Sequence, residues 1–176
     1  MNWLTLKPDN EMDWKRQQSD ILAFINRCAG KRLYRNVYHE LLMLSYRDLS
    51  KPGTLLQLVT VQAEDGPRIA AFSGAAGYGQ DLCIVVVHPL YRGIGLGTTL
   101  LKQQLAALGS LTCQIALDDL GALQMGFRAG LCAKGLIKIH GGKRGLLLQE
   151  SSQDPMLGLS ESNGKQKFAA NLAQRR

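Results

Sequence analysis

One segment in the middle of the chain constrains the fold more than any other. The apolar run Leu82–Val87 has the composition of a buried β-strand, and Gly93, Gly95 and Gly97 follow it just before a leucine-rich stretch with helical spacing. Because glycine lacks a Cβ atom, such a turn brings backbone N–H groups close to an anion, and the start of a helix adds further free amides and a positive dipole end. The segment therefore predicts a strand, loop and helix that together bind a phosphate or pyrophosphate group.

The spacing of the glycines separates this loop from other phosphate-binding loops. A Walker loop requires a lysine after its last glycine, whereas Thr98 follows Gly97 here. The dinucleotide-binding fingerprint would place its third glycine at Thr98 or Leu100. A loop of the kind found in S-adenosylmethionine methyltransferases, with Asp118 as the acidic residue, stays a distant alternative because Pro89 and Arg92 separate the strand from the glycines.

The stretch Val87-His88-Pro89-Leu90-Tyr91-Arg92-Gly93-Ile94-Gly95-Leu96-Gly97 resembles motif A of the GNAT superfamily of N-acyltransferases. The resemblance implies that the loop wraps the pyrophosphate of acetyl-CoA, the acyl donor, and that the preceding strand lines a groove for the pantetheine arm. The guanidinium group of Arg92 would offer a planar set of donors to phosphate oxygens. The expected cofactor-binding residues are Val85, Val86, Val87, Arg92, Gly93, Ile94, Gly95, Leu96, Gly97 and Thr98.

Length and composition fit a single domain. A chain of 176 residues with 45% hydrophobic residues has material for one core. We expect a GNAT-like domain over residues 1–150 and a polar, basic, flexible tail over residues 151–176. The first ten residues contain no apolar run long enough for a signal peptide or membrane span, so a cytoplasmic protein that does not enter the membrane is expected.

The charge of the chain favours anionic ligands. The formal net charge is +7, and coenzyme A is one ligand that a positive field attracts. A nucleic-acid partner is disfavoured because the basic tail has little interleaved aromatic character, with Phe168 alone. The four cysteines and three histidines are widely spaced, so no metal site is predicted and the cysteines are interpreted as small core residues.

Periodicity predicts a mixed α/β (α+β) architecture, with about seven strands and four helices in the order β-α-α-β-β-β-α-β-α-β-β. The strand Leu82–Val87 is expected to lie centrally because it is continuously apolar, and a strand-helix-strand unit would place Leu111–Leu117 parallel to it. A hairpin is expected from 54–61 and 68–75, and another from 136–140 and 145–149 around a glycine turn at 141–144. The resemblance matches this order and implies that the two strands flanking the motif A helix splay apart around a V-shaped cleft.

The sequence departs from the family pattern at one catalytic position. The family places a tyrosine, which protonates the departing thiolate, four residues before a Gly-Phe pair, but Gly126-Phe127 here is preceded by Ala122 at that position. We expect Asp81 as general base and Tyr78 as proton donor, with Glu64, Asp118 and His88 as further candidate bases and water or unassisted departure as alternatives to Tyr78.

The resemblance implies an acetyl-CoA-dependent N-acetyltransferase in which a primary amine attacks directly in a ternary complex. The acceptor would be a small molecule or a peptide, and a homodimer is the default assembly. The alternative is a catalytically silent acyl-CoA-binding or regulatory module.

Overall fold

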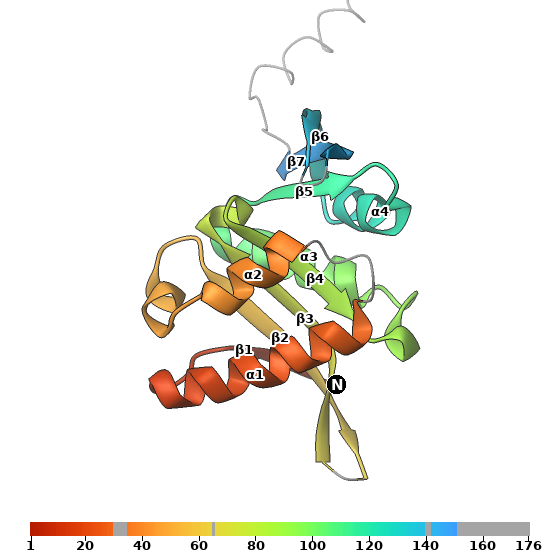
Figure 1. Cartoon of the computed structure of the whole chain (residues 1–176). Coiled ribbons are helices and arrows are strands. Elements are labelled where there is room, and N and C mark those ends of the chain that lie inside the picture. The colour runs from red at the N-terminus through yellow and green to blue at the C-terminus, as the bar shows by residue number, and fades with distance from the viewer. Residues whose placement is uncertain (30–34, 65, 140–141, 151–176) are drawn as a thin grey trace, which may run out of the picture.

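The computed structural model describes residues 1–29, 35–64, 66–139 and 142–150. The predicted tail at 151–176 lies outside these residues, as do His140 and Gly141 of the second predicted hairpin. Figure 1 shows two sheets stacked end to end, with α1 and α2 across one face of the larger sheet and α3 behind it.

The larger sheet is antiparallel and has the strand order β1-β2-β3-β4. The first hairpin is confirmed: β2 pairs with β3 from Leu55↔Ala75 to Ala63↔Gly66, with a register shift between Val59 and Thr60. β4 then pairs with β3 from Ala71↔Val87 to Ala76↔Leu82. The four strands are β1 (Asn2–Thr5), β2 (Leu55–Ala63), β3 (Gly66–Ala76) and β4 (Leu82–Val87).

The smaller sheet is also antiparallel and has the order β5-β7-β6. Its strands are β5 (Thr112–Ala116), β6 (Leu131–Lys138) and β7 (Arg144–Glu150). The second predicted hairpin therefore exists, but β6 begins five residues earlier than Leu136, where the periodicity placed it. Cys132 to Gly135 are exposed, so this half of the strand lacks the apolar alternation by which a strand is recognised.

Within the described residues, four α-helices and three short 3₁₀ helices connect the strands. The α-helices are α1 (Glu11–Cys28), α2 (Arg35–Met43), α3 (Leu96–Leu108) and α4 (Leu120–Arg128), and the 3₁₀ helices are η2 (Tyr46–Ser50), η3 (Gly77–Gly79) and η4 (Pro89–Tyr91). The Asn10 side chain caps α1 by accepting from the Asp13 amide. The order of helices and strands predicted from the sequence is confirmed.

The position of β4 corrects one prediction. The sequence predicts a central position for β4 in one sheet, but β4 lies at the edge of its own sheet and shares no ladder with β5, so the strands form two sheets instead of one. The absence of a ladder between the two strands that flank α3 fits the expected splay. The apolar character of β4 has another cause: Leu82, Ile84 and Val86 face the core under α1 and α2, whereas Val85 and Val87 pack toward α3. A continuously apolar strand thus indicates that both of its faces are buried. It does not indicate that both of its edges are hydrogen-bonded to other strands.

The core is arranged around the two sheets. One cluster, which includes Trp14, Ile21, Leu41 and Phe72, lies between the larger sheet and the pair α1 and α2. A second cluster, which includes Leu101, Leu111 and Leu148, joins α3 and α4 to the smaller sheet. No helix in the described part of the chain is long and apolar enough to cross a membrane.

Candidate functional site

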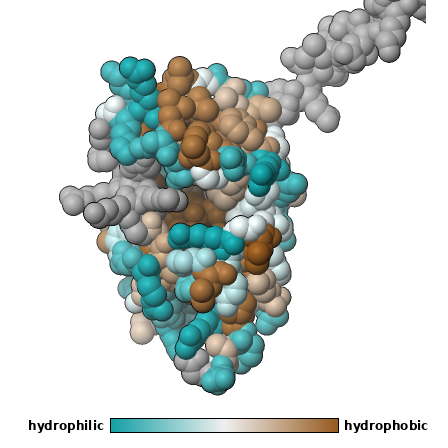
Figure 2. Space-filling view, turned by 90° about the vertical axis from the view of Figure 1, so that its right-hand side faces the viewer, coloured by the Kyte–Doolittle hydropathy of each residue, from teal (hydrophilic) through white to brown (hydrophobic). Residues whose placement is uncertain are grey.

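A cleft of about 410 Å³ lies between the C-terminal part of β4, the start of α3, and α4. The last residues of α1, Cys28 and its neighbour Ala29, complete its rim. Figure 2 shows this side of the molecule, where the surface is hollowed at mid-height and hydrophobic side chains are exposed in the recess. The described residues thus form a cavity whose lining joins the valines at the end of β4 to the glycines of the following loop, with both apolar and polar side chains.

The glycine-rich end has the backbone geometry of an anion cradle. Gly93 and Gly95 have φ angles of +81° and +88°, in the left-handed region that favours glycine, and a Cβ atom built on either would meet no atom within 4 Å. The space above both residues is therefore open. The first helical bond of α3 runs from the Thr99 amide to the Gly95 carbonyl at 3.0 Å, so the amides of the three preceding residues lie ahead of the ladder.

The predicted cofactor-binding residues are brought together, with one exception. Val85, Val86, Val87, Arg92, Gly93, Gly95, Leu96, Gly97 and Thr98 all line the cleft. Ile94 does not line it and its side chain is 62% exposed, because the turn directs this residue outward between the two open glycines.

Arg92 lines the cleft but uses part of its guanidinium group within the protein. Its Nε atom donates to the Val87 carbonyl at 3.1 Å and its Nη2 atom donates to the Cys28 carbonyl at 2.7 Å. Arg92 thus links the C-terminal end of α1 to the end of β4. A cation is favourable at this place because the carbonyl end of a helix carries partial negative charge.

Several side chains that line the cleft were not predicted from the sequence. Arg128 of α4 adds a second cation, and Met125 faces Gly97, where a Cβ atom would lie 2.5 Å from the methionine sulphur. Asp119 also lines the cleft, and its Oδ1 atom caps α4 by accepting from the Ala122 amide at 3.1 Å. The Asp119 and Ala122 spacing indicates where α4 begins, but no sequence signal places this helix beside α3.

Cys28 is the cysteine of the cleft rim. Its side chain is buried, and burial raises the pKa of the thiol, an effect that the charges of Arg27 and Arg92 oppose. A thiol with a raised pKa is protonated near neutral pH and is a poor nucleophile. Cys28 therefore forms part of the apolar wall.

The two expected catalytic residues lie in one tight turn that precedes β4. Tyr78 has a φ angle of +57° and a side chain that is 38% exposed, and its amide donates to the Gly53 carbonyl at 3.0 Å. Asp81 does not line the cleft of about 410 Å³ but a second cavity of about 240 Å³, with Glu40, Asp48 and Lys51. The structure thus places Asp81 and Tyr78 beyond the opposite end of β4 from the glycines.

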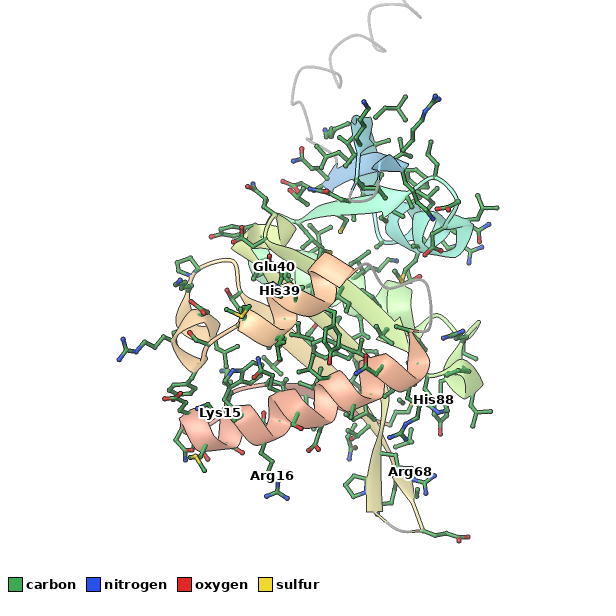
Figure 3. The ribbon with its side chains drawn as sticks, in the orientation of Figure 1. Lys15, Arg16, His39, Glu40, Arg68 and His88 are labelled. Carbon is green, nitrogen blue, oxygen red and sulfur yellow. The ribbon has the colours of Figure 1, made fainter. Side chains whose placement is uncertain are left out.

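The other candidate bases are held elsewhere. Asp118 is exposed and its carboxylate pairs with the Lys143 ammonium at 2.7 Å, whereas Glu64 is exposed beside the β2–β3 turn. His88 follows β4, and its Nδ1 atom accepts from the Leu90 amide at 3.3 Å. Figure 3 shows His88 beyond the end of β4 and His39 with Glu40 on α2. Within the described ranges, no group of three or more His, Cys, Asp and Glu residues is placed to hold a metal ion.

Comparisons with known proteins agree with this geometry. No protein-family profile and no curated protein matches the sequence. Solved structures do match. A mutant of the spermidine N-acetyltransferase SpeG from Vibrio cholerae has a TM-score of 0.53 at 14% identity, covering 85% of this chain and 94% of its own.

Aminoglycoside acetyltransferases are also similar in structure. AAC(6')-Ib in complex with coenzyme A and kanamycin has a TM-score of 0.55 at 12% identity and covers 86% of this chain and 96% of its own. The same enzyme with paromomycin and acetyl-CoA has a TM-score of 0.56 at 12% identity, with coverages of 87% and 95%. The fold that the sequence resemblance implied is confirmed: this chain has the fold of the GNAT acetyltransferases.

Proposed function

We propose that the protein is an acetyl-CoA-dependent N-acetyltransferase that transfers an acetyl group to a primary amine by direct attack in a ternary complex. One observation carries the proposal: two left-handed glycines with open space above them lie at the N-terminus of α3, in a cleft that Val85 to Val87 also line. The acceptors named for solved proteins of this fold, spermidine and kanamycin, both carry several amino groups.

The residues present suit the acyl donor. Gly93 and Gly95 leave room for a diphosphate, which the α3 amides and the charges of Arg92 and Arg128 would hold. Val85 to Val87 would line the path of the pantetheine arm along the unpaired edge of β4. When bound, the donor supplies an activated thioester, and the chain contributes mainly its position relative to the amine.

We retain Asp81 and Tyr78 as the proposed base and acid. A donor whose diphosphate lies at the glycines and whose arm follows β4 would direct its thioester toward the start of that strand. Asp81 and Tyr78 belong to the turn at this end. The proposal predicts that Asp81→Asn and Tyr78→Phe lower kcat and leave the Kd of acetyl-CoA unchanged. Equal kcat values for the wild type and both variants would contradict it.

Binding of the donor is tested by isothermal titration with a variant and a matched control. Gly95→Glu would place a carboxylate in the proposed diphosphate site, so binding of acetyl-CoA should be lost. Gly109→Glu is the control, because Gly109 ends the same helix with a φ angle of +74° and open space around its Cβ position. Both variants carry the strain of a left-handed side chain, about 1–2 kcal/mol, so equal loss of binding in both would contradict the proposal.

A second function is favoured by one observation. Ala122, which stands where the family has its tyrosine, lines the cleft and has no hydroxyl group. A silent acyl-CoA-binding module would bind the donor in the titration and release no thiol. A thiol-release screen with acetyl-CoA and a panel of polyamines, aminoglycosides, amino acids and lysine peptides separates the two functions, because turnover above the rate without protein excludes the silent module.

A further inference from the structure

Two cysteines that lie thirty positions apart in the sequence meet between the two sheets. The Sγ atoms of Cys83, on β4, and Cys113, on β5, are 3.0 Å apart, and both residues are free thiols. The two strands share no backbone ladder, so this contact joins the two sheets through side chains.

The surroundings hold the two strands together at this point. Gly79, in the turn before β4, packs so closely on β5 that a Cβ atom would overlap the Thr112 carbonyl oxygen. Cys113 is buried at 3% exposure, within the core cluster of the smaller sheet, and Cys83 is half-buried and packs against the same cluster. The sulphur atoms are therefore positioned by packed backbone on both sides.

The two thiols differ in access to solvent. The hydrogen bond with Cys83, followed by burial, raises the pKa of the Cys113 thiol far above its usual range. Cys83 is the more exposed partner, so a small oxidant in solution would reach it first.

We propose that Cys83 and Cys113 are a modification site at which a small hydroperoxide forms a reversible disulfide between the two sheets. In the first step the Cys83 thiolate attacks a peroxide oxygen, the O–O bond breaks, and hydroxide leaves and is protonated to water. In the second step the Cys113 sulphur attacks the Cys83 sulphur while its proton passes to the sulfenic hydroxyl group, so that the S–S bond forms, the S–O bond breaks and water leaves. The two thiols are oxidised, and hydrogen peroxide is reduced to two molecules of water.

The disulfide would act on the cleft through β4. Cys83 lies on the same face of this strand as Val85 and Val87, which line the cleft. A disulfide holds its sulphur atoms about 2.05 Å apart, closer than the 3.0 Å between the thiols. Oxidation would thus draw β5, and with it the following helix α4, which lines the cleft, toward β4 and narrow the space for the pantetheine arm; this consequence, unlike the disulfide itself, rests on the proposed function.

The site is tested by peptide mapping of the full chain after treatment with hydrogen peroxide. Trypsin places each cysteine in a separate peptide: 28–31, 69–92, 103–128 and 129–134. The expected result is a link between peptides 69–92 and 103–128, with the mass of their sum less two hydrogens, which dithiothreitol removes. The matched control Cys132→Ser, at an exposed cysteine, should keep the link, and Cys83→Ser should lose it.

Two outcomes would overturn the proposal. One is a disulfide that involves Cys28 or Cys132 in place of the Cys83–Cys113 pair. The other is the absence of any link between peptides 69–92 and 103–128 at peroxide concentrations that oxidise Cys132. Since the wild-type protein alone decides both, a folding defect in Cys83→Ser does not affect the test.

The effect of the disulfide on acetyl-CoA binding is measured separately. Oxidised wild type should bind acetyl-CoA with a several-fold higher Kd than the reduced protein, and dithiothreitol should restore the reduced value. If reduced protein fails to bind acetyl-CoA, the proposed function fails while the mapped disulfide stands. If reduced and oxidised protein bind equally, the disulfide does not act on the cleft.

Discussion

The guanidinium group of Arg92 donates to the backbone carbonyl of Cys28 at 2.7 Å, which connects the glycine loop to the last turn of α1. A second donation, from Nε to the Val87 carbonyl at 3.1 Å, ties the same side chain to the end of β4. Arg92 thereby fixes three elements around one end of the cleft.

The first prediction concerns this link. Arg92→Lys keeps the positive charge but cannot make both donations from one planar group. We expect it to lower the free energy of unfolding by about 1 kcal/mol and to weaken acetyl-CoA binding nearly as much as Arg92→Ala does, as measured by urea denaturation and titration calorimetry. Binding by Arg92→Lys at the wild-type Kd would mean that only the charge of this residue matters.

The second prediction concerns the contact between α3 and α4. Gly97→Ala would place a methyl group 2.5 Å from the Met125 sulphur, so the helices must separate or Met125 must move. We expect a loss of about 1–3 kcal/mol in the free energy of unfolding. In the Met125→Ala background, Gly97→Ala should lower the free energy of unfolding much less. A double-mutant cycle with no coupling energy would show that the two residues do not contact each other.

The third prediction concerns the closest approach of the two sheets. Gly79→Ala forces its methyl group against the Thr112 carbonyl oxygen, which belongs to rigid backbone. We expect the free energy of unfolding to fall by roughly 3 kcal/mol or more, as measured by thermal or urea denaturation. Gly130→Ala is the matched control, because Gly130 has a φ angle of +99° and no atom within 4 Å of its Cβ position; it should lose only the cost of backbone strain.

The fourth prediction concerns pH. Hydrogen bonds from Lys51 and then Ser45 hold the pKa of the Asp48 carboxyl well below its usual range. Because the folded pKa lies below the unfolded one, this group stabilises the fold above about pH 4. Its contribution is lost as the pH falls through the folded pKa.

Asp48→Asn should therefore reduce the unfolding free energy at pH 7 by about 0.5–1 kcal/mol, the usual range for an exposed cap or ion pair. The difference between variant and wild type should shrink as the pH is lowered below 4. A difference that grows with acidification would contradict the assignment. Glu40→Gln, in the same cavity wall, serves as the control substitution.

Local sequence signals predicted most elements of the fold. The bounds of β4 and the glycines that flank α3 follow from composition and from backbone requirements that only glycine meets easily. The separation of the sheets was not predictable from the residues alone, because the apolar run of β4 is the same for a central strand and for an edge strand covered on both faces.

The candidate site was predictable where its residues are consecutive. Val85 to Thr98 form one loop and its flanks, so their proximity follows from the chain, apart from the outward turn at Ile94. Asp119, Met125 and Arg128 enter the cleft only through the packing of α4 against α3, and the meeting of Cys83 with Cys113 depends on how the two sheets abut. Such long-range contacts leave no spacing pattern in the sequence.

The division into two sheets also bears on how the chain acquires its structure. Every ladder of the larger sheet joins strands from the first 87 residues, and every ladder of the smaller one joins strands from residues 112–150. Each sheet is thus assembled from a consecutive stretch, and during synthesis the first can pair completely before the second has been made. The cleft then forms last, when α3 packs the two completed sheets together.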